Sequence, residues 1–281
     1  MSPAIEQSFS YCRHIARSRA KNFYYSFLLL TPQQRRAMCA IYAFMRYCDD
    51  LSDEPGANAA AMDRWRAEME DAFEGRFSDH PVWPAFHYTV RRFGIPRQYF
   101  RDMVDGVASD LVPRRMETFE ELYRYCYQVA SVVGLTTIHI FGFDTPSALP
   151  LAEKCGVAFQ LTNILRDIRE DAERGRIYLP AEDLRSFGVT EDDLRAGNRS
   201  EAVLKLLRFE AERARRYYAE SRPLLDLVHP RSRPSLLALI TIYSRLLQRI
   251  EETNYDVFSH RVRLAAIEKS WIMLRCLAGS V

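Results

Sequence analysis

Apolar residues recur at intervals of three and four along almost the whole chain, and no segment alternates apolar and polar residues for long. This spacing is typical of amphipathic helices and argues against half-buried strands. The sequence therefore predicts an all-α protein. The expected helices, separated by breakers that contain Gly or Pro, span residues 4–19, 32–54, 58–74, 82–93, 96–109, 117–141, 147–172, 199–227, 232–255 and 259–277.

Residues 174–198 contain three glycines and a proline, and we expect a loop there that holds one or two short helices. No stretch of the 281 residues has the composition of a linker, and 48% hydrophobic residues suffice for an extensive core. We therefore expect one domain that spans residues 1–281.

Charge and cysteine usage narrow the class of protein. Lys and Arg number 39 and Asp and Glu number 37, so the net charge of +2 gives no reason to expect binding to nucleic acid. The six cysteines show no Cys-x-x-Cys spacing, which predicts reduced core thiols rather than zinc or redox pairs. Neither a signal-peptide pattern nor an apolar stretch long enough to cross a bilayer is found, so we expect a cytoplasmic protein.

The first acidic motif, Asp49 and Asp53, lies at the end of a predicted helix. Tyr42, Arg46, Asp49 and Asp53 follow one another at steps of four, three and four, so they share one stripe over about three turns. A solvated helix end with an intrahelical Arg–Asp pair would show the same pattern.

The second acidic motif, Asn163, Asp167 and Asp171, repeats the spacing of four about a hundred residues further on. Gln160 extends it upstream, so this polar stripe opens with amides, which suit a lined cavity. Arginines around the motif supply the planar guanidinium groups that bind phosphate oxygens in pairs: Arg166, Arg169, Arg174 and Arg176. A salt-bridged, exposed helix is the alternative.

Together the two acidic motifs indicate a cation site. Stacked carboxylates destabilise an isolated helix unless a cation lies between them, and oxygen ligands favour Mg²⁺ held together with substrate phosphate. Metal and arginine could ease loss of a diphosphate, which leaves a carbocation that aromatic faces can stabilise. The chain has 15 Tyr and 16 Phe, although core packing explains any single one equally well. We expect an enzyme that acts on diphosphates.

Small residues follow Tyr125 along a central helix, at Ala130, Ser131 and Gly134. A glycine inside a helix costs about 1 kcal/mol relative to alanine, so it normally has a packing or cavity reason. Close packing of a neighbouring helix and a channel for a long apolar ligand explain this pattern equally well.

The chain resembles the squalene/phytoene synthase family over nearly its whole length. The resemblance is carried, in order, by Lys21-Asn22-Phe23-Tyr24-Tyr25, Ala40-Ile41-Tyr42-Ala43-Phe44, Asp49-Asp50-Leu51-Ser52-Asp53, Tyr125-Cys126-Tyr127, Gln160-Leu161-Thr162-Asn163-Ile164-Leu165-Arg166-Asp167 and Gly175-Arg176-Ile177-Tyr178-Leu179-Pro180. It implies the isoprenoid (terpenoid) synthase fold, a helical bundle around a central cavity. It also implies Mg²⁺, with roughly two or three ions, and head-to-head joining of two prenyl diphosphates through a cyclopropylcarbinyl diphosphate.

Carried over by position, the resemblance implies roles for individual residues. The metal ligands would be Asp49, Asp53, Asn163, Asp167 and Asp171. The diphosphate would be bound by Lys21, Arg46, Arg166 and Arg176, with a hydrogen bond from Tyr178 near the leaving group. The reaction cavity would be lined by Phe23, Tyr42, Tyr125 and Gln160. The residues expected to act in catalysis are Asp49, Asp53, Asp167, Asp171, Arg166 and Tyr125. Tyr125 or the released diphosphate would accept the proton lost on cyclopropane formation.

Within the family, the run Asp49 to Gly56 is most similar to bacterial presqualene diphosphate synthases of hopanoid pathways, whereas Asn254 to Phe258 resembles phytoene synthases as well. The main hypothesis is condensation of two farnesyl diphosphates to presqualene diphosphate without NADPH. The alternatives are phytoene synthesis from geranylgeranyl diphosphate, squalene or dehydrosqualene synthesis, and a non-catalytic helical lipid-binding protein. The expected partners are prenyl diphosphates and downstream pathway enzymes, with loose membrane contact through the apolar substrate.

Overall fold

The computed structural model describes residues 2–20, 23–53, 57–112 and 115–278, and within them every regular element is a helix. Two isolated β-bridges, Arg115 with Ile177 and Phe143 with Val228, are the β-type pairings of these residues. The all-α prediction is confirmed. Lys21 and the side chain of Asp53, both expected in the site, lie outside the described residues.

The first part of the chain forms α1 (Pro3–Arg19), α2 (Phe23–Phe27), α3 (Pro32–Asp53), α4 (Ala59–Phe73), α5 (Trp83–Phe93), α6 (Arg97–Ala108) and the 3-10 turn η1 (Ser109–Leu111). The second part forms α7 (Phe119–Cys126), the π turn η2 (Tyr127–Ser131), α8 (Val132–Phe141), α9 (Ala148–Glu173), α10 (Ala181–Phe187), α11 (Glu191–Arg195), α12 (Glu201–Ser221), α13 (Leu224–Leu227), α14 (Arg233–Glu252) and α15 (Ala266–Leu277).

Most predicted helices are confirmed to within a few residues, and the predicted loop 174–198 contains α10 and α11. The helix α2 was not predicted. The helix predicted over 117–141 is interrupted by η2, and the one predicted over 199–227 ends at Ser221 because Pro223 cannot continue it.

The prediction of a helix over 259–277 is wrong at its start, because α15 begins only at Ala266. In the preceding segment, Val262 and Leu264 are buried while Arg261 and Arg263 are exposed. This alternation has the period of an extended chain, not of a helix.

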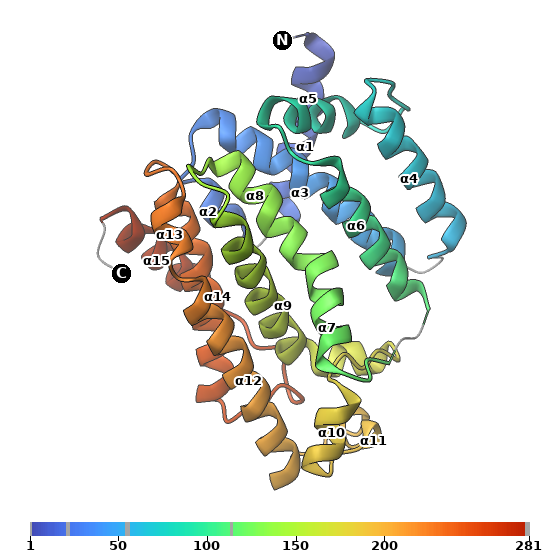
Figure 1. Cartoon of the computed structure of the whole chain (residues 1–281), viewed down its shortest axis with the longest axis vertical. Coiled ribbons are helices and arrows are strands. Elements are labelled where there is room, and N and C mark those ends of the chain that lie inside the picture. Colours follow the sequence, from blue (N-terminus) through green and yellow to red (C-terminus); the bar gives the residue numbers. More distant parts are fainter. Residues whose placement is uncertain (1, 21–22, 54–56, 113–114, 279–281) are drawn as a thin grey trace.

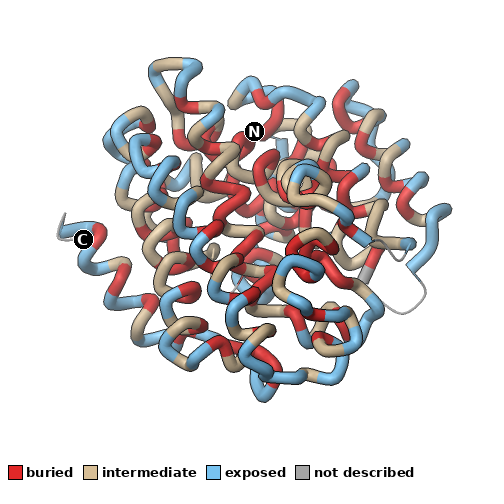
Figure 2. Tube along the Cα trace, turned by 60° about the horizontal axis from the view of Figure 1, so that its bottom comes forward, coloured by how far each residue is buried: buried red, intermediate tan, exposed pale blue. Residues whose placement is uncertain are grey.

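The helix α9 lies at the centre of the bundle, in contact with α12, α8, α14 and η2 (Figure 1). On the other side, α3 packs against α1, α5, α6 and α8. Buried residues are concentrated on the inward faces of these helices (Figure 2). The two acidic motifs therefore belong to two helices, α3 and α9, that enclose the interior from opposite sides.

Close helix packing explains two glycines around η2. A Cβ atom on Gly106 of α6 would lie 2.6 Å from Gln128 Cβ, and one on Gly156 of α9 would lie 2.5 Å from Ser131 Cα. Contacts this short are forbidden, so η2 fits between α6 and α9 only because both positions lack a side chain. For Gly134 of α8, close helix packing and a cavity both apply, because this residue packs against Ala152 and also lines a cavity.

All six cysteines are buried, which confirms their expected place in the core, and no disulfide joins them. Over the described part of the chain, no helix combines the length and the apolarity needed to span a bilayer.

Candidate active site

Two adjoining hollows, a polar pocket of about 410 Å³ and an apolar cavity of about 230 Å³, lie between α3 and α9. Four residues line both of them, namely Arg46, Asp49, Gln160 and Asn163. We call these four the junction. The remaining lining of the polar pocket consists of Ser52, Asp110, Tyr125, Ile164, Arg166, Asp167, Glu170, Asp171, Arg174, Arg176, Tyr178 and Arg261.

The polar pocket brings the two acidic motifs together. Asp49 comes from α3, whereas Asn163, Asp167 and Asp171 come from successive turns of α9, and all four line the same space. Among the predicted residues whose side chains are described, Arg46, Arg166, Arg176 and Tyr178 also line this pocket, and so does Tyr125, which was expected to line the reaction cavity.

Asp167 is held by two arginines. Arg166 Nε donates to its Oδ1 over 2.8 Å, while Arg261 Nε lies 2.9 Å from Oδ1 and Arg261 Nη2 donates to Oδ2 over 3.0 Å. The side chains of Arg166 and Asp167 are only 12% and 15% exposed, so this pairing is shielded from water. A cation that binds Asp167 must therefore share it with, or take it from, these guanidinium groups.

Asp171 lies one turn further along α9 and is largely buried, near two other carboxylates and two arginines. Burial, followed by the charges of Asp167 and Asp110, raises the pKa of Asp171 to about 7, although Arg176 and Arg174 oppose the shift. A carboxyl group in this state is half protonated near neutral pH. A bound cation would favour its ionised form.

The donor set of the polar pocket fits a hard divalent cation such as Mg²⁺. Asn163 Oδ1 is buried without a hydrogen-bond partner, and the carboxylates of Asp49 and Asp171 line the same pocket. Among the described residues, no three Asp, Glu, His or Cys side chains are already grouped at the spacing of a metal site.

Arg46 offers a further unused donor. Its Nη2 is paired with Asp50 rather than Asp49, and its Nε is buried without a hydrogen-bond partner at the junction. A buried N–H without an acceptor is costly, and a phosphate oxygen at the junction would satisfy it. Arg176, by contrast, already donates from Nη2 to the carbonyl oxygens of Ser52 and Asp110, over 3.2 and 3.0 Å.

Asp110 is a pocket residue that the sequence did not predict. Its Oδ2 accepts a hydrogen bond from Tyr125 over 2.9 Å, and its Oδ1 accepts one from Tyr178 over 3.0 Å. Burial and the charge of Asp110 raise the pKa of both Tyr125 and Tyr178. Both phenols therefore keep their protons, which argues against Tyr125 as the general base.

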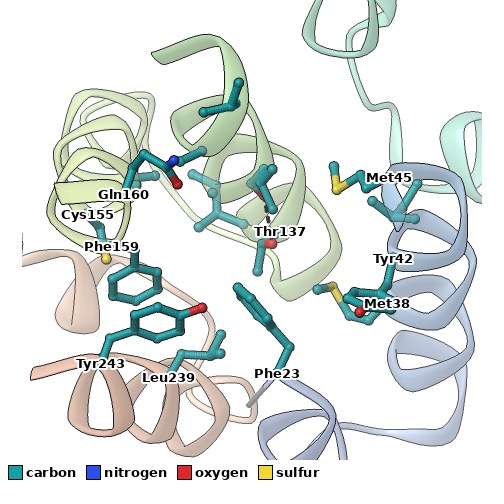
Figure 3. Close-up of a pocket in the computed structure, with 18 of the residues that line it drawn as sticks. Phe23, Met38, Tyr42, Met45, Thr137, Cys155, Phe159, Gln160, Leu239 and Tyr243 are labelled. Carbon is teal, nitrogen blue, oxygen red and sulfur yellow. Dashed lines mark hydrogen bonds between the residues drawn. The ribbon is translucent and has the colours of Figure 1, made fainter. Parts of the chain in front are cut away.

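The apolar cavity extends from the junction into the bundle and is rich in aromatic and sulfur-containing side chains (Figure 3). Phe159 and Tyr243 stack with their ring centroids 4.4 Å apart, and Phe23 lies 5.6 Å from Tyr243. Phe23, Tyr42 and Gln160 line the cavity as predicted. Such walls can hold a hydrocarbon chain, and their ring faces can stabilise a positive charge.

Phe159, Tyr243 and Arg261 were not among the predicted site residues. Phe159 belongs to the apolar pattern of its helix, which core residues show equally well, so the sequence does not single it out. Tyr243 lies on another helix, about 80 residues beyond the start of the second acidic motif. Arg261 is 94 residues from Asp167 along the chain. Its position beside Asp167 depends on the extended chain before α15.

An all-α bundle whose apolar cavity opens at a mouth of carboxylates and arginines defines the class of isoprenoid synthases. Residues 16–268 match the family model for squalene/phytoene synthase, and the chain belongs to this family of head-to-head prenyltransferases. The family resemblance deduced from the sequence is thereby confirmed.

Among relatives, the chain is 38% identical to phytoene synthase 2, chloroplastic, of Solanum lycopersicum, over 94% of this chain and 88% of the relative. It is 37% identical to 15-cis-phytoene synthase of Synechocystis sp., over 95% of this chain and 83% of the relative.

Among solved structures, a dehydrosqualene synthase in complex with ligand superposes with a TM-score of 0.91 at 31% identity, covering 98% of this chain and 97% of that one. Squalene synthase HpnC from Alicyclobacillus acidocaldarius superposes with a TM-score of 0.85 at 30% identity, covering 91% of this chain and 97% of that one.

Proposed function

We propose that this chain is a phytoene synthase, which condenses two molecules of geranylgeranyl diphosphate head to head in the presence of Mg²⁺. The C20 substrate is supported by the phytoene synthases at 37–38% identity over more than nine tenths of the chain, and it replaces farnesyl diphosphate as the main hypothesis. The geometry that supports the chemistry is the junction, where a polar pocket meets an apolar cavity.

A prenyl diphosphate that lies across the junction has its charged end and its hydrocarbon end in matching surroundings. Asp49, Asp53, Asn163, Asp167 and Asp171 would hold magnesium, which neutralises diphosphate charge and so eases cleavage of the C–O bond. The unused Nε of Arg46 would bind a diphosphate oxygen, and Arg166 would support the charge that develops on the leaving group.

The cavity then has to protect a cation. After ionisation, C1 of the first chain is attacked by a double bond of the second, and loss of a proton closes the cyclopropane. Phe159, Tyr243 and Phe23 face this space, exclude water and attract positive charge through their rings.

The released diphosphate is the better candidate for the base in this step. Tyr125 holds its proton because burial and Asp110 raise the pKa of the phenol. A diphosphate anion held at the junction lies next to the reacting carbons and is basic. Ionisation of the cyclopropylcarbinyl diphosphate then releases the second diphosphate, and the rearranged cation loses a second proton instead of accepting a hydride. NADPH is therefore not expected.

A second candidate is condensation of two farnesyl diphosphates to presqualene diphosphate, as the sequence alone suggested, or to dehydrosqualene. The observation that favours it is the superposition with a dehydrosqualene synthase at a TM-score of 0.91, over nearly the full length of both chains.

Product analysis separates these candidates. The purified chain is incubated with farnesyl or geranylgeranyl diphosphate, each with Mg²⁺ or EDTA and with or without NADPH. We expect phytoene from the C20 substrate, formed only with Mg²⁺ and unaffected by NADPH. Products only from the C15 substrate would favour the second candidate. No turnover with either substrate would leave a non-catalytic lipid-binding protein as the remaining alternative.

A further inference from the structure

The C-terminal helix α15 exposes a row of large apolar side chains. Ile267, Trp271, Leu274 and Leu277 are 80%, 62%, 60% and 59% exposed, and their spacing places them on one side of the helix. We call these four the outer face of α15. The helix lies at the margin of the bundle (Figure 2), so the outer face points away from the core.

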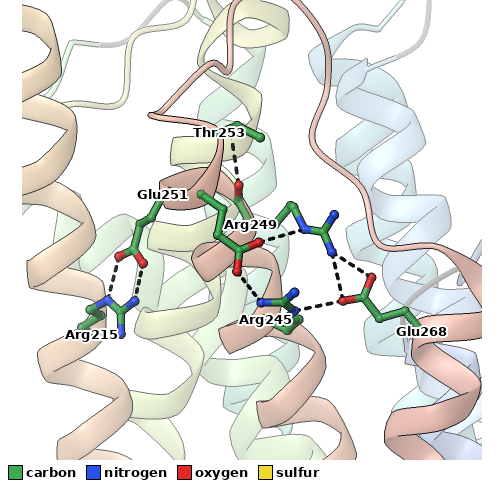
Figure 4. Close-up of polar contacts among 7 residues, drawn as sticks. Arg215, Arg245, Arg249, Glu251, Thr253 and Glu268 are labelled. Carbon is green, nitrogen blue, oxygen red and sulfur yellow. Dashed lines mark hydrogen bonds and ion pairs between the residues drawn. The ribbon is translucent and has the colours of Figure 1, made fainter.

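Ion pairs hold α15 in this orientation (Figure 4). Glu268 accepts from Arg245 Nε over 3.0 Å and from Arg249 Nη2 over 3.3 Å, and Glu252 binds both arginines from the other side. Glu268 is the only acidic residue of α15, and these pairs turn it toward α14. The outer face is therefore apolar and carries no carboxylate.

The inner side of α15 is continuous with the wall of the apolar cavity. Ile272 and Cys276 are buried in one cluster with Tyr243, and Phe23 and Phe159 pack against the same cluster. These three aromatic residues also line the cavity. Whatever binds the outer face thus lies one helix away from the hydrocarbon site.

We propose that the outer face of α15 docks into the interfacial layer of a lipid bilayer that contains anionic lipids. Tryptophan and leucine on one side of a helix, with basic residues beside them, are typical of interfacial helices. Arg275 flanks the outer face, Arg263 precedes the helix, and both are exposed, so their charge complements anionic headgroups. The purpose of docking rests on the proposed function, because a hydrocarbon product without a headgroup must leave for a lipid phase.

A second copy of this chain fits the outer face less well. Stable protein interfaces bury about 800 Å² of surface on each partner. Four side chains on one side of a short helix expose only about a few hundred Å² of apolar surface. A bilayer needs no matching partner surface, since it accepts apolar side chains from any direction.

Vesicle flotation tests the proposal with the full chain and no substrate. We expect the protein to float with vesicles of phosphatidylcholine containing about 30% phosphatidylglycerol, and far less with pure phosphatidylcholine. Trp271→Ser together with Leu274→Ser should lower the bound fraction by about tenfold. The matched control is Phe77→Ser, which removes a 44% exposed aromatic side chain elsewhere and should float like the parent.

Tryptophan fluorescence of the unmodified protein gives an independent measurement. Trp65 and Trp83 are 3% and 0% exposed, so Trp271 dominates quenching by iodide. Anionic vesicles should shift the emission to shorter wavelength and protect it from iodide. Unchanged emission and no flotation would overturn the proposal, as would a dimer in sedimentation velocity that the double substitution dissociates. Flotation requires no turnover, so failure of the product assay would leave this result standing.

Discussion

The polar pocket and the apolar cavity meet at the junction but differ in how ready they are for a ligand. In the polar pocket the charged groups already bind one another, as Asp167 binds Arg166 and Arg261. The cavity walls have no such competition, because stacked rings such as Phe159 and Tyr243 lose nothing when a hydrocarbon arrives. Binding in the polar pocket must exchange ion pairs, whereas binding among the stacked rings of the cavity breaks no ion pair. Substitutions in the two regions should therefore impair activity in different ways.

The largest effect is expected in the polar pocket. Asp171→Asn keeps the shape of the side chain but removes a charged oxygen, so kcat should fall by about a thousandfold. The Mg²⁺ concentration that gives half-maximal activity should also rise. The control is Asp79→Asn, an exposed carboxylate that does not line the pocket, which should behave like the parent. Full activity of Asp171→Asn with unchanged Mg²⁺ dependence would refute a metal role for this position.

A smaller loss is expected in the cavity. Phe159→Leu keeps an apolar wall but removes a ring face, so kcat should fall by about ten- to a hundredfold as the cation loses stabilisation. Its Mg²⁺ dependence should stay that of the parent, in contrast to Asp171→Asn. A shifted metal dependence would show that the two regions do not act separately. Phe77→Leu is the matched control.

Substitutions of two neighbouring tyrosines, one inside the polar pocket and one outside it, test how far the functional site extends. Tyr125→Phe deletes a hydroxyl that donates to Asp110, and activity should fall by about tenfold because the carboxylate loses a buried partner. Tyr123→Phe deletes a hydroxyl that donates to Glu153, outside the pocket, and should have little effect. A general base must be deprotonated to act, so it produces the limb on which activity rises with pH. The pH profile of Tyr125→Phe should keep this rising limb, since this phenol is not the base. Loss of that limb would restore Tyr125 as a candidate.

The smallest effect concerns stability. The folded-state pKa of Asp171, about 7, is above the unfolded value, so the folded state binds this proton more tightly. Stability contributed by the protonated group is lost as pH rises from about 4 to 7. Near pH 7.5 and without metal, Asp171→Asn should raise the free energy of unfolding by about 1–3 kcal/mol. Thermal melts should show that gain vanish near pH 4. An equal gain at both pH values would point to a cause other than this charge.

Most of the scaffold could be predicted because α3 and α9 carry a regular helical period together with their acidic residues. The spacing of four in Asp167 and Asp171 placed them on one face of α9, and both line the pocket. Asp110 could not be found in this way, because it stands alone in a short 3-10 turn. Only the folded structure brings it into hydrogen-bonding contact with Tyr125 and Tyr178. The roles of all the predicted site residues, Lys21 and Asp53 included, stay predictions.

The π turn η2 could not be predicted either, since Tyr127 to Ser131 continue the apolar pattern of their neighbours. A π turn holds an extra residue compared with an α-helical turn, so it changes the angular position of everything that follows. Tyr125 before it faces the polar pocket, whereas Val133 and Gly134 after it line the cavity. Deleting one residue from the turn would give a regular helix and rotate the following residues by about 100°. One inserted amino acid thus lets the consecutive elements α7, η2 and α8 serve both the charged and the hydrocarbon half of a ligand.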